Sequence, residues 1–459
     1  MKKQKISTLI LVSLMSFGLL TSGCKKCDKN DPNSDCYEPP ARGNAVIEGE
    51  IKKNRTLSVD TTYLLKGFVY VVDGATLTIP AGTIIKGDKE TKATLIIERG
   101  GKIMAQGTKE KPIVFTSNQP KGQRDYGDWG GIIICGKARV NNPGGEARIE
   151  GGPRSFYGGT NDNDNSGIMT YCRIEFCGVE YQTDNEINGL TMGGVGKGTT
   201  IHHIQVSYSG DDSFEWFGGN VDCKYLVAFR GWDDEFDTDN GYSGRLQFLV
   251  AIRDKNVADQ SISNGFESDN DATGSDNTPI TSPVFSNVTI YGPIDLSHVP
   301  TGGNGNFRAA MHIRRNSQLQ VYNSVFVGWP VGLFIDGDKC ASNAQNGSLV
   351  VKNCIMAGMG NNFHNDASEA HYNREGGNNQ IKSLSELRLN NLENLNLAKI
   401  NFLPQSGSPL LSGANFTGLP SYFEQVNFVG AFGTTDWTAG WCNLILKIQI
   451  TNNVCQCFS

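Results

Sequence analysis

Short segments in which apolar and polar residues alternate recur along most of the chain. Each segment ends at a glycine or a polar turn, and no spacing of three to four residues accompanies the alternation. This period of two, rich in β-branched and aromatic residues, predicts short β-strands. Seven segments align on one apolar position, occupied by Ile174, Val206, Val227, Val250, Val288, Val325 and Ile355. The intervals between these positions are 32, 21, 23, 38, 37 and 30 residues, which indicates a unit near 22 residues that often carries an insertion.

A second series of segments interleaves with the first. It includes SFEWFGG and EFDTDNG, in which Phe214 and Phe236 stand 22 residues apart. A repeat of this length, made of short strands, predicts coils that stack on their neighbours. We therefore expect an all-β chain whose residues 44–415 form a parallel β-helix (a solenoid) with N- and C-terminal caps. Residues 416–459 are the expected C-terminal cap, and Phe214, Phe236 and Phe266 are expected to stack inside.

The order of the motifs in the N-terminal half also resembles a known family. GATLTIPAGT, GGKIMAQGT, PIVFTS and GDWGGI follow one another along the chain. Together with the coil length, this order resembles the right-handed parallel β-helix of the pectate-lyase-like superfamily. The resemblance covers roughly residues 45–415 and implies a right-handed coil.

Acidic residues repeat with the same period as the strands. At an offset of 22, Asp211 and Asp212 overlie Asp233 and Asp234. Aspartates at a coil corner commonly accept hydrogen bonds from turn amides, and we favour that interpretation for these doublets over a ligand site.

A second acidic row is expected to face outward. Two carboxylates about 4.8 Å apart repel each other by roughly 3 kcal/mol at an effective dielectric constant near 20. A bound Ca²⁺, a shared proton or a set of turn amides would each offset that repulsion. For this row we favour a cation site, and the expected metal ligands are Glu215, Asp237, Asp239, Glu267 and Asp269.

The acidic doublet raises the question of catalysis. Residues 210–212 read GDD and resemble an element of β-helical polygalacturonases, in which aspartates act as general acid and base. The G-H-G and R-I-K elements of that pattern are missing. Polysaccharide lyases of this fold combine calcium-binding acids with a basic residue, and Arg314 resembles such a base, although an ion pair on a strand is the alternative for it. If the chain is an enzyme, the resemblance implies the catalytic residues Asp211, Asp212, Asp234 and Arg314.

Aromatic residues near the expected corners suggest contact with carbohydrate. Trp216, Trp232 and Tyr242 are the candidates, because a sugar ring can lie flat on an exposed aromatic face. Packing of these rings against neighbouring loops is the equally favoured alternative.

The N-terminus predicts export and lipidation. Lys2, Lys3 and Lys5 precede a short apolar run that ends in Leu-Thr-Ser-Gly-Cys, which resembles the lipobox of bacterial lipoproteins. Residues 1–23 are thus a predicted signal peptide, Cys24 a predicted lipidation site and 24–43 a predicted flexible tether. An ordinary signal peptide is the alternative. Loss of 1–23 removes three lysines and no acids, so the formal charge moves from −6 to −9, which argues against nucleic acid as a partner.

Two functions remain open. The tail motifs GSPLLSG and FVGAFGTTDWTAGW resemble surface lipoproteins of Bacteroidota-type bacteria, which often work beside TonB-dependent outer-membrane transporters. This predicts a lipid-anchored protein of the outer membrane or cell surface that binds a polysaccharide or an envelope partner without catalysis. The alternative is a calcium-dependent polysaccharide lyase or a glycoside hydrolase acting on an acidic polysaccharide.

Overall fold

A computed structural model describes residues 42–182, 185–300, 305–390 and 400–446. The predicted signal peptide, the lipidation site Cys24 and nearly all of the tether lie outside these residues. No helix in the described part of the chain is both long and apolar enough to cross a membrane. Residues from Gly43 onward form one compact unit, and the sections below concern this unit.

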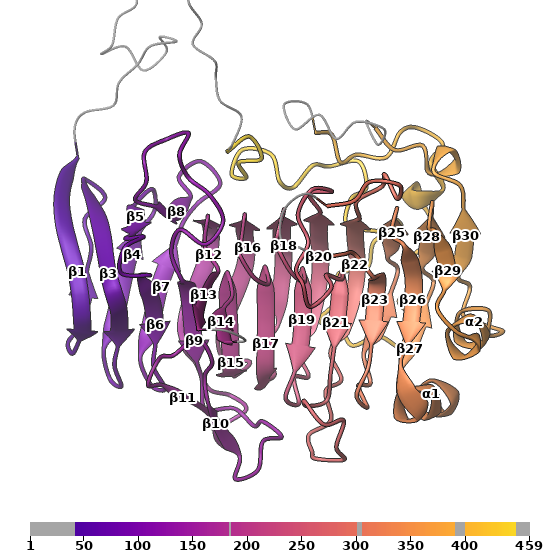
Figure 1. Ribbon diagram of the computed structural model, residues 1–459, viewed down its shortest axis with the longest axis horizontal. Coiled ribbons are helices and arrows are strands. Elements are labelled where there is room, and N and C mark those ends of the chain that lie inside the picture. Colours follow the sequence, from indigo (N-terminus) through magenta and orange to yellow (C-terminus); the bar gives the residue numbers. More distant parts are fainter. Residues whose placement is uncertain (1–41, 183–184, 301–304, 391–399, 447–459) are drawn as a thin grey trace, which may run out of the picture. The chain divides into compact units, whose positions relative to one another are not determined.

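The unit is a right-handed parallel β-helix, as the sequence predicts. Its coils stack their strands in three rows, shown side by side in Figure 1. The first row comprises β2 (Arg55–Thr56), β4 (Thr76–Pro80), β7 (Lys102–Gln106), the first halves of β12 (Gly167–Glu175), β16 (Thr200–Ser207), β18 (Cys223–Phe229), β20 (Arg245–Ile252) and β22 (Val284–Tyr291), then β24 (Gln320–Tyr322) and β27 (Val350–Lys352).

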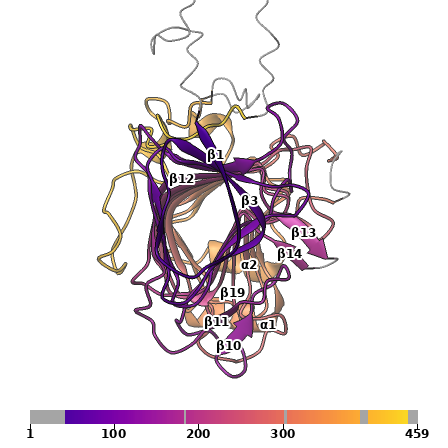
Figure 2. The same cartoon turned by 90° about the vertical axis from the view of Figure 1, so that its left-hand side faces the viewer.

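The second row contains β1 (Gly43–Ile51), the start of β3 (Thr61–Val71), β5 (Ile84–Gly87), β8 (Ile113–Ser117), the second halves of β12 to β22, β25 (Val325–Val327), β28 (Ile355–Ala357) and β30 (Gln380–Lys382). The third row contains the end of β3, β6 (Thr94–Ile97), β9 (Gly131–Cys135), β15 (Leu190–Val195), β17 (Phe214–Gly219), β19 (Phe236–Asp239), β21 (Phe266–Ser268), β23 (Ala309–Ile313), β26 (Val331–Ile335) and β29 (Asn361–Phe363). Viewed along the coil axis, the rows surround a common interior (Figure 2).

Insertions between the strands carry the remaining elements. Two antiparallel hairpins, β10 (Glu146–Arg148) with β11 (Phe156–Gly158) and β13 (Val179–Gln182) with β14 (Asn185–Ile187), lie beside the third row. Helices α1 (Gly337–Asn346) and α2 (Asp366–Tyr372) follow β26 and β29, and single 3₁₀ turns occur at Ser385–Leu387 and Pro409–Leu411.

The interior is filled by ladders of apolar residues. Phe214, Phe236 and Phe266 are directly paired in successive coils, as predicted. Their ring centroids are 5.8 Å and 5.7 Å apart, and all three side chains are fully buried. Each ring thus covers the next, which is how a coil that cannot bury its own inner face obtains a core.

The alignment of the first series is one residue out of register in places. Val206 pairs with Ala228 rather than with Val227, because the true offset is 22 residues and not 21. Val206 therefore points into the core, whereas Val227 and its partner Val250 point outward. Side chains alternate between the faces of a strand, so a shift of one residue exchanges inside for outside.

These outward apolar residues explain the position of the C-terminal segment. The described part of residues 400–446 packs along the outer face of the second row, where Phe432 and Trp441 share an apolar cluster with Val227. The side chains of Gln247 and Gln205 each hold one peptide of this segment, at Glu424 and Asn443. The sequence predicts residues 416–459 as an end cap, but residues 416–446 cover a side, because an exposed apolar stripe would otherwise face water.

Candidate functional site

The predicted outward acidic row exists on the third row of strands. Glu215 pairs with Asp237, and Asp237 pairs with Glu267, so the three carboxylates occupy successive coils. Asp239 and Asp269 stand two positions further along the same strands. The repeat of 22 residues between Glu215 and Asp237 thus produces the stacking that the sequence predicts.

Carboxylate oxygens gather closely enough along this row to share a cation. They form three groups, each with oxygens within 4.8 Å of one another: Asp211 with Asp212 and Asp233, Asp212 with Glu215 and Asp237, and Asp234 with Asp237 and Glu267. Hard oxygen ligands in a flexible arrangement suit Ca²⁺.

Two further oxygens at this row fit a cation. The hydroxyl of Thr191, next to Glu215 in register, is 1% exposed, and it has no hydrogen-bond partner among the described residues. The same is true of the buried Oδ1 atom of Asp237. Buried polar atoms are normally paired, so both atoms point to a missing partner.

The second aspartate of each doublet caps the corner. Asp212 Oδ1 accepts a hydrogen bond of 2.8 Å from the backbone N–H of Asp234, and Asp234 accepts one from the backbone N–H of Asn264. Both side chains are buried. Asp212 and Asp234 therefore link successive coils, which matches the interpretation favoured for the doublets.

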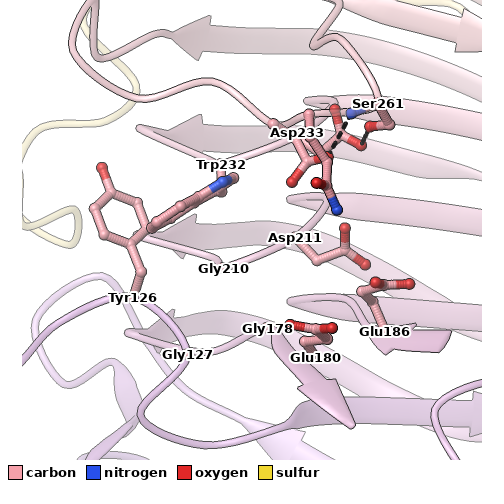
Figure 3. A pocket seen from close by; sticks show the side chains of 12 residues that line it. Tyr126, Gly127, Gly178, Glu180, Glu186, Gly210, Asp211, Trp232, Asp233 and Ser261 are labelled. Carbon is pink, nitrogen blue, oxygen red and sulfur yellow. Dashed lines mark hydrogen bonds between the residues drawn. The ribbon is translucent and has the colours of Figure 1, made fainter. Parts of the chain in front are cut away.

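The first aspartate of each doublet lines a cleft of about 980 Å³ beside this corner. Figure 3 shows Asp211 between Asp233 and Glu186, with Trp232 and Tyr126 on the opposite side. The two aromatic rings meet edge to face at a centroid distance of 5.2 Å. The cleft therefore has one aromatic wall and one acidic wall. It is lined by Tyr126, Gly127, Gly178, Glu180, Glu186, Gly210, Asp211, Trp232, Asp233, Asp259, Gln260 and Ser261.

A buried ion pair fixes the position of Trp232. Arg253 and Glu235, both fully buried side chains, are 3.0 Å apart, and Arg253 also donates to the carbonyl oxygens of Trp232 and Asp233. The N–H of Trp232 donates to the carbonyl of Ser209 in the preceding coil. The backbone that carries the ring is thus held on both sides. Sequence reasoning missed Arg253, whose only signal is a lone basic residue on an otherwise apolar strand.

Burial and mutual repulsion make these carboxyl groups poor acids. Burial, with repulsion from Asp259, raises the pKa of Asp233 to about 7. Burial, with repulsion from Asp233, raises the pKa of Asp211 well above its usual range. The same two causes, in that order, raise the pKa of Glu215 strongly, and they raise the pKa of Asp239 to about 8.

The acidic row ends at basic residues. Arg314 contacts Glu267 and pairs with Asp269 at 2.8 Å, and Arg315 pairs with Asp269 at 2.7 Å. His312, almost fully buried, lies 3.3 Å from Glu267. The structure thus brings Arg314 to the acidic row, but as an ion-pair partner, which is the alternative that the sequence left open. The position of Arg314 depends on the insertion between β21 and β23, which carries no repeat signal.

Two of the three predicted ligand-binding aromatic residues are in the wrong place for that role. Trp216 and Tyr242 are fully buried, and their rings stack at 5.5 Å inside the helix. Trp216 stands two residues after the inward-facing Phe214 and therefore shares its face. Tyr242 donates its hydroxyl proton to the carbonyl of Val221. Only Trp232 lines the cleft.

Several acidic residues of the site come from insertions and were not predicted. Glu180 and Glu186 are on the hairpin β13–β14, and Asp259 is in the loop after β20. Glu150 approaches Glu215 through the amide of Asn188, which donates to both, and burial raises the pKa of Glu150 to about 7. These residues lie outside the repeat, so the spacing of the repeat could not reveal them.

Comparison with known proteins places this geometry in a family. Residues 49–400 match the family described as pectate-lyase like beta helix domain. No curated protein and no solved structure matches the chain. The family match extends over well more than half of the chain and ends where the stacked strands have ended. The chain therefore belongs to the pectate-lyase-like β-helix domain family, and this membership supports a carbohydrate-related role.

Proposed function

We propose that the protein binds a polysaccharide chain in the cleft beside Trp232 without cleaving it. The observation that carries this proposal is the pairing of an aromatic wall with a hydrogen-bonding wall in one cleft of about 980 Å³. A pyranose ring presents apolar C–H faces and a polar edge, and the two walls are complementary to these surfaces. The rigid backbone around Trp232 lowers the entropy that such a contact costs.

The proposal includes the location of the protein. A lipid on Cys24 would hold the β-helix at the outer membrane or the cell surface, with residues 24–43 as a tether. An envelope partner such as a TonB-dependent outer-membrane transporter would fit this location. The support for the anchor and the partner is the N-terminal lipobox-like sequence and the resemblance of the tail motifs.

The proposal also includes Ca²⁺ as a structural ion on the acidic row. Its support is the three groups of carboxylate oxygens within 4.8 Å, together with the unpaired oxygens of Thr191 and Asp237. Glu215, Asp237 and Glu267 would be the central ligands, with Asp239 and Asp269 next to them. The ion would stiffen the coils that carry the cleft.

Binding is tested with the full chain and a set of soluble oligosaccharides, measured by calorimetry. We expect Trp232→Ala to abolish binding and Trp232→Phe, which keeps an aromatic face, to retain most of it. Circular dichroism and melting temperature check that both variants fold. If Trp232→Ala binds every oligosaccharide as the parent chain does, the cleft is not the binding site and the proposal is wrong.

A second candidate function is cleavage of an acidic polysaccharide, by hydrolysis or by a calcium-dependent lyase reaction. Asp211 and Asp233 favour it, because carboxyl groups with raised pKa values in a cleft suit proton transfer near neutral pH. Arg314 is less suited to act as a base, since its ion pairs with Glu267 and Asp269 raise its pKa above the usual value. New reducing ends or unsaturated products from uronic-acid polysaccharides, lost in Asp211→Asn, would establish this function in place of simple binding.

A further inference from the structure

The charge of the cleft narrows the kind of glycan that it can take. The described residues that line it include no lysine, arginine or histidine. Five of them are acids, supplied by four separate segments: Glu180, Glu186, Asp211, Asp233 and Asp259. An acidic polysaccharide would place its own carboxylates against this wall and would be repelled.

The basic groups near the cleft are already paired. Arg253 lies behind the wall, where it is bound to Glu235 and to backbone carbonyl groups. Arg230 pairs with Asp254 at 3.2 Å. Lys92 donates to the backbone carbonyl of Glu180 at 2.7 Å, which leaves the carboxylate of that residue unneutralised by it. The acidic wall thus has no internal cation to balance it.

The wall also has unused hydrogen-bond acceptors. Asp233 accepts a hydrogen bond from the hydroxyl of Ser261 on Oδ2, whereas its buried Oδ1 has no partner among the described residues. A carboxylate offers only acceptors, and an ammonium group offers three donors and a positive charge. A cationic ligand would therefore satisfy both the charge and the unpaired oxygen.

The aromatic wall selects among cationic ligands. The faces of Trp232 and Tyr126 suit a rigid ring with apolar C–H groups, and tryptophan also attracts a nearby cation. A sugar that carries a free amino group has both a ring to lie on the indole and an ammonium group for the acidic wall. A lysine side chain has the ammonium group but no rigid ring.

We propose that the cleft recognises a polysaccharide whose sugars carry free amino groups, with the ammonium groups on Asp211 and Asp233 and the ring faces on Trp232. This inference rests on the proposed glycan-binding function of the same cleft. It predicts that removal of positive charge from the sugar weakens binding even when the ring and the chain length are unchanged.

The test compares four ligands of equal length by calorimetry on the full chain, with Ca²⁺ held constant. They are tetramers of glucosamine, N-acetylglucosamine and galacturonate, and tetralysine. At a pH where the amine is charged, we expect the glucosamine tetramer to bind at least tenfold more tightly than the other three. We also expect this preference to shrink as salt is raised from 50 to 500 mM.

Variants separate charge recognition from the aromatic contact. Asp233→Asn keeps the shape of the side chain, and we expect it to reduce the preference for the glucosamine tetramer at least fivefold. Glu375→Gln, a change in an exposed acid after α2, should leave every affinity unchanged.

The two proposals fail in different ways. If the N-acetylated tetramer binds as tightly as the glucosamine tetramer, and Trp232→Ala abolishes both, the inference is wrong while glycan binding stands. If tetralysine binds as tightly as the glucosamine tetramer, the cleft recognises cationic peptides and the inference is also wrong. If no tetrasaccharide binds, both proposals fail.

Discussion

Asp212 accepts a hydrogen bond on Oδ1 from the backbone N–H of Asp234, 22 residues later in the chain. Its sequence neighbour Asp211 lies instead in the cleft beside Asp233. Two adjacent, chemically identical residues therefore have different roles: one joins two coils, and the other is free to meet a ligand. The difference can be measured.

Replacement of each aspartate by alanine and by asparagine should separate these roles. Both changes remove the charge, but only asparagine keeps an acceptor oxygen. Because Asp212→Ala leaves the N–H of Asp234 buried and unpaired, we expect it to be less stable than Asp212→Asn by about 1–3 kcal/mol in the free energy of unfolding. For Asp211 the two variants should agree within about 0.5 kcal/mol. Urea denaturation gives these values, and equal stability of the two Asp212 variants would contradict the capping role.

Calcium should stabilise the protein through the acidic row. At a Ca²⁺ concentration 100 times its dissociation constant, a single site adds about 2.7 kcal/mol to the free energy of unfolding. We expect Asp237→Asn, at the centre of the row, to fold and to lose this response, since Asp237 belongs to two of the three oxygen groups. Melting temperatures with Ca²⁺ and with EDTA test this. A full calcium response in Asp237→Asn would remove the row from consideration as the site.

Stability without calcium should fall as the pH rises. The folded-state pKa is raised to about 7 for Asp233 and Glu150 and to about 8 for Asp239, chiefly by burial. The unfolded values are near 4, so between about pH 4 and pH 8 the folded state binds more protons than the unfolded state. Each such group therefore removes up to about 1.4 kcal/mol of stability for every pH unit gained in this window.

Melting temperatures in EDTA between pH 5 and pH 8.5 provide the measurement. We expect a steady decrease over this range in the parent chain and a shallower decrease in Asp239→Asn, which cannot lose a proton at that position. Glu375→Gln is the matched control and should follow the parent chain. A melting temperature that rises with pH would contradict the raised pKa values.

The C-terminal segment should detach when its polar contacts are removed. Gln247 donates to the carbonyl of Glu424 at 2.7 Å and accepts from its N–H at 2.8 Å, and Gln205 does the same at Asn443 at 2.7 Å and 2.9 Å. Gln247→Leu and Gln205→Leu each leave a buried peptide unpaired, so we expect each to cost about 1–3 kcal/mol.

Limited proteolysis reports where that loss occurs. Cleavage within residues 411–446 should become faster in both glutamine variants while the stacked strands stay protected. Lys224→Met removes an ion pair with Glu424 at the protein surface and should have little effect, because exposed ion pairs contribute about 0–1 kcal/mol. Unchanged cleavage in both glutamine variants would contradict the role of these side chains.

Local repetition was what the sequence could reveal. The stack of Phe214, Phe236 and Phe266 and the acidic row beside it follow from an apolar and polar alternation that repeats at about 22 residues. Register errors appeared where the marker was weak: valine occupies both faces of the second row, so Val206 and Val227 looked equivalent although one points inward and the other outward.

Residues outside the repeat could not be placed in this way. Arg314 reaches Glu267 and Asp269 only because the insertion after β21 ends in register with the previous coil. Glu180, Glu186 and Asp259 meet at the cleft through loops of unrelated lengths. Trp216 and Trp232 have similar surroundings in the sequence, yet one is in the core and the other at the cleft.

The amino-acid sequence by itself determined the parallel coil, its period and the two acidic rows, because strand alternation and stacking act over one repeat and leave a periodic trace. Only the tertiary structure decided which acids line a cleft, which base neutralises the end of the row and which face the C-terminal segment covers. Those contacts join segments separated by insertions, and their free energy depends on distances in space that no spacing along the chain records.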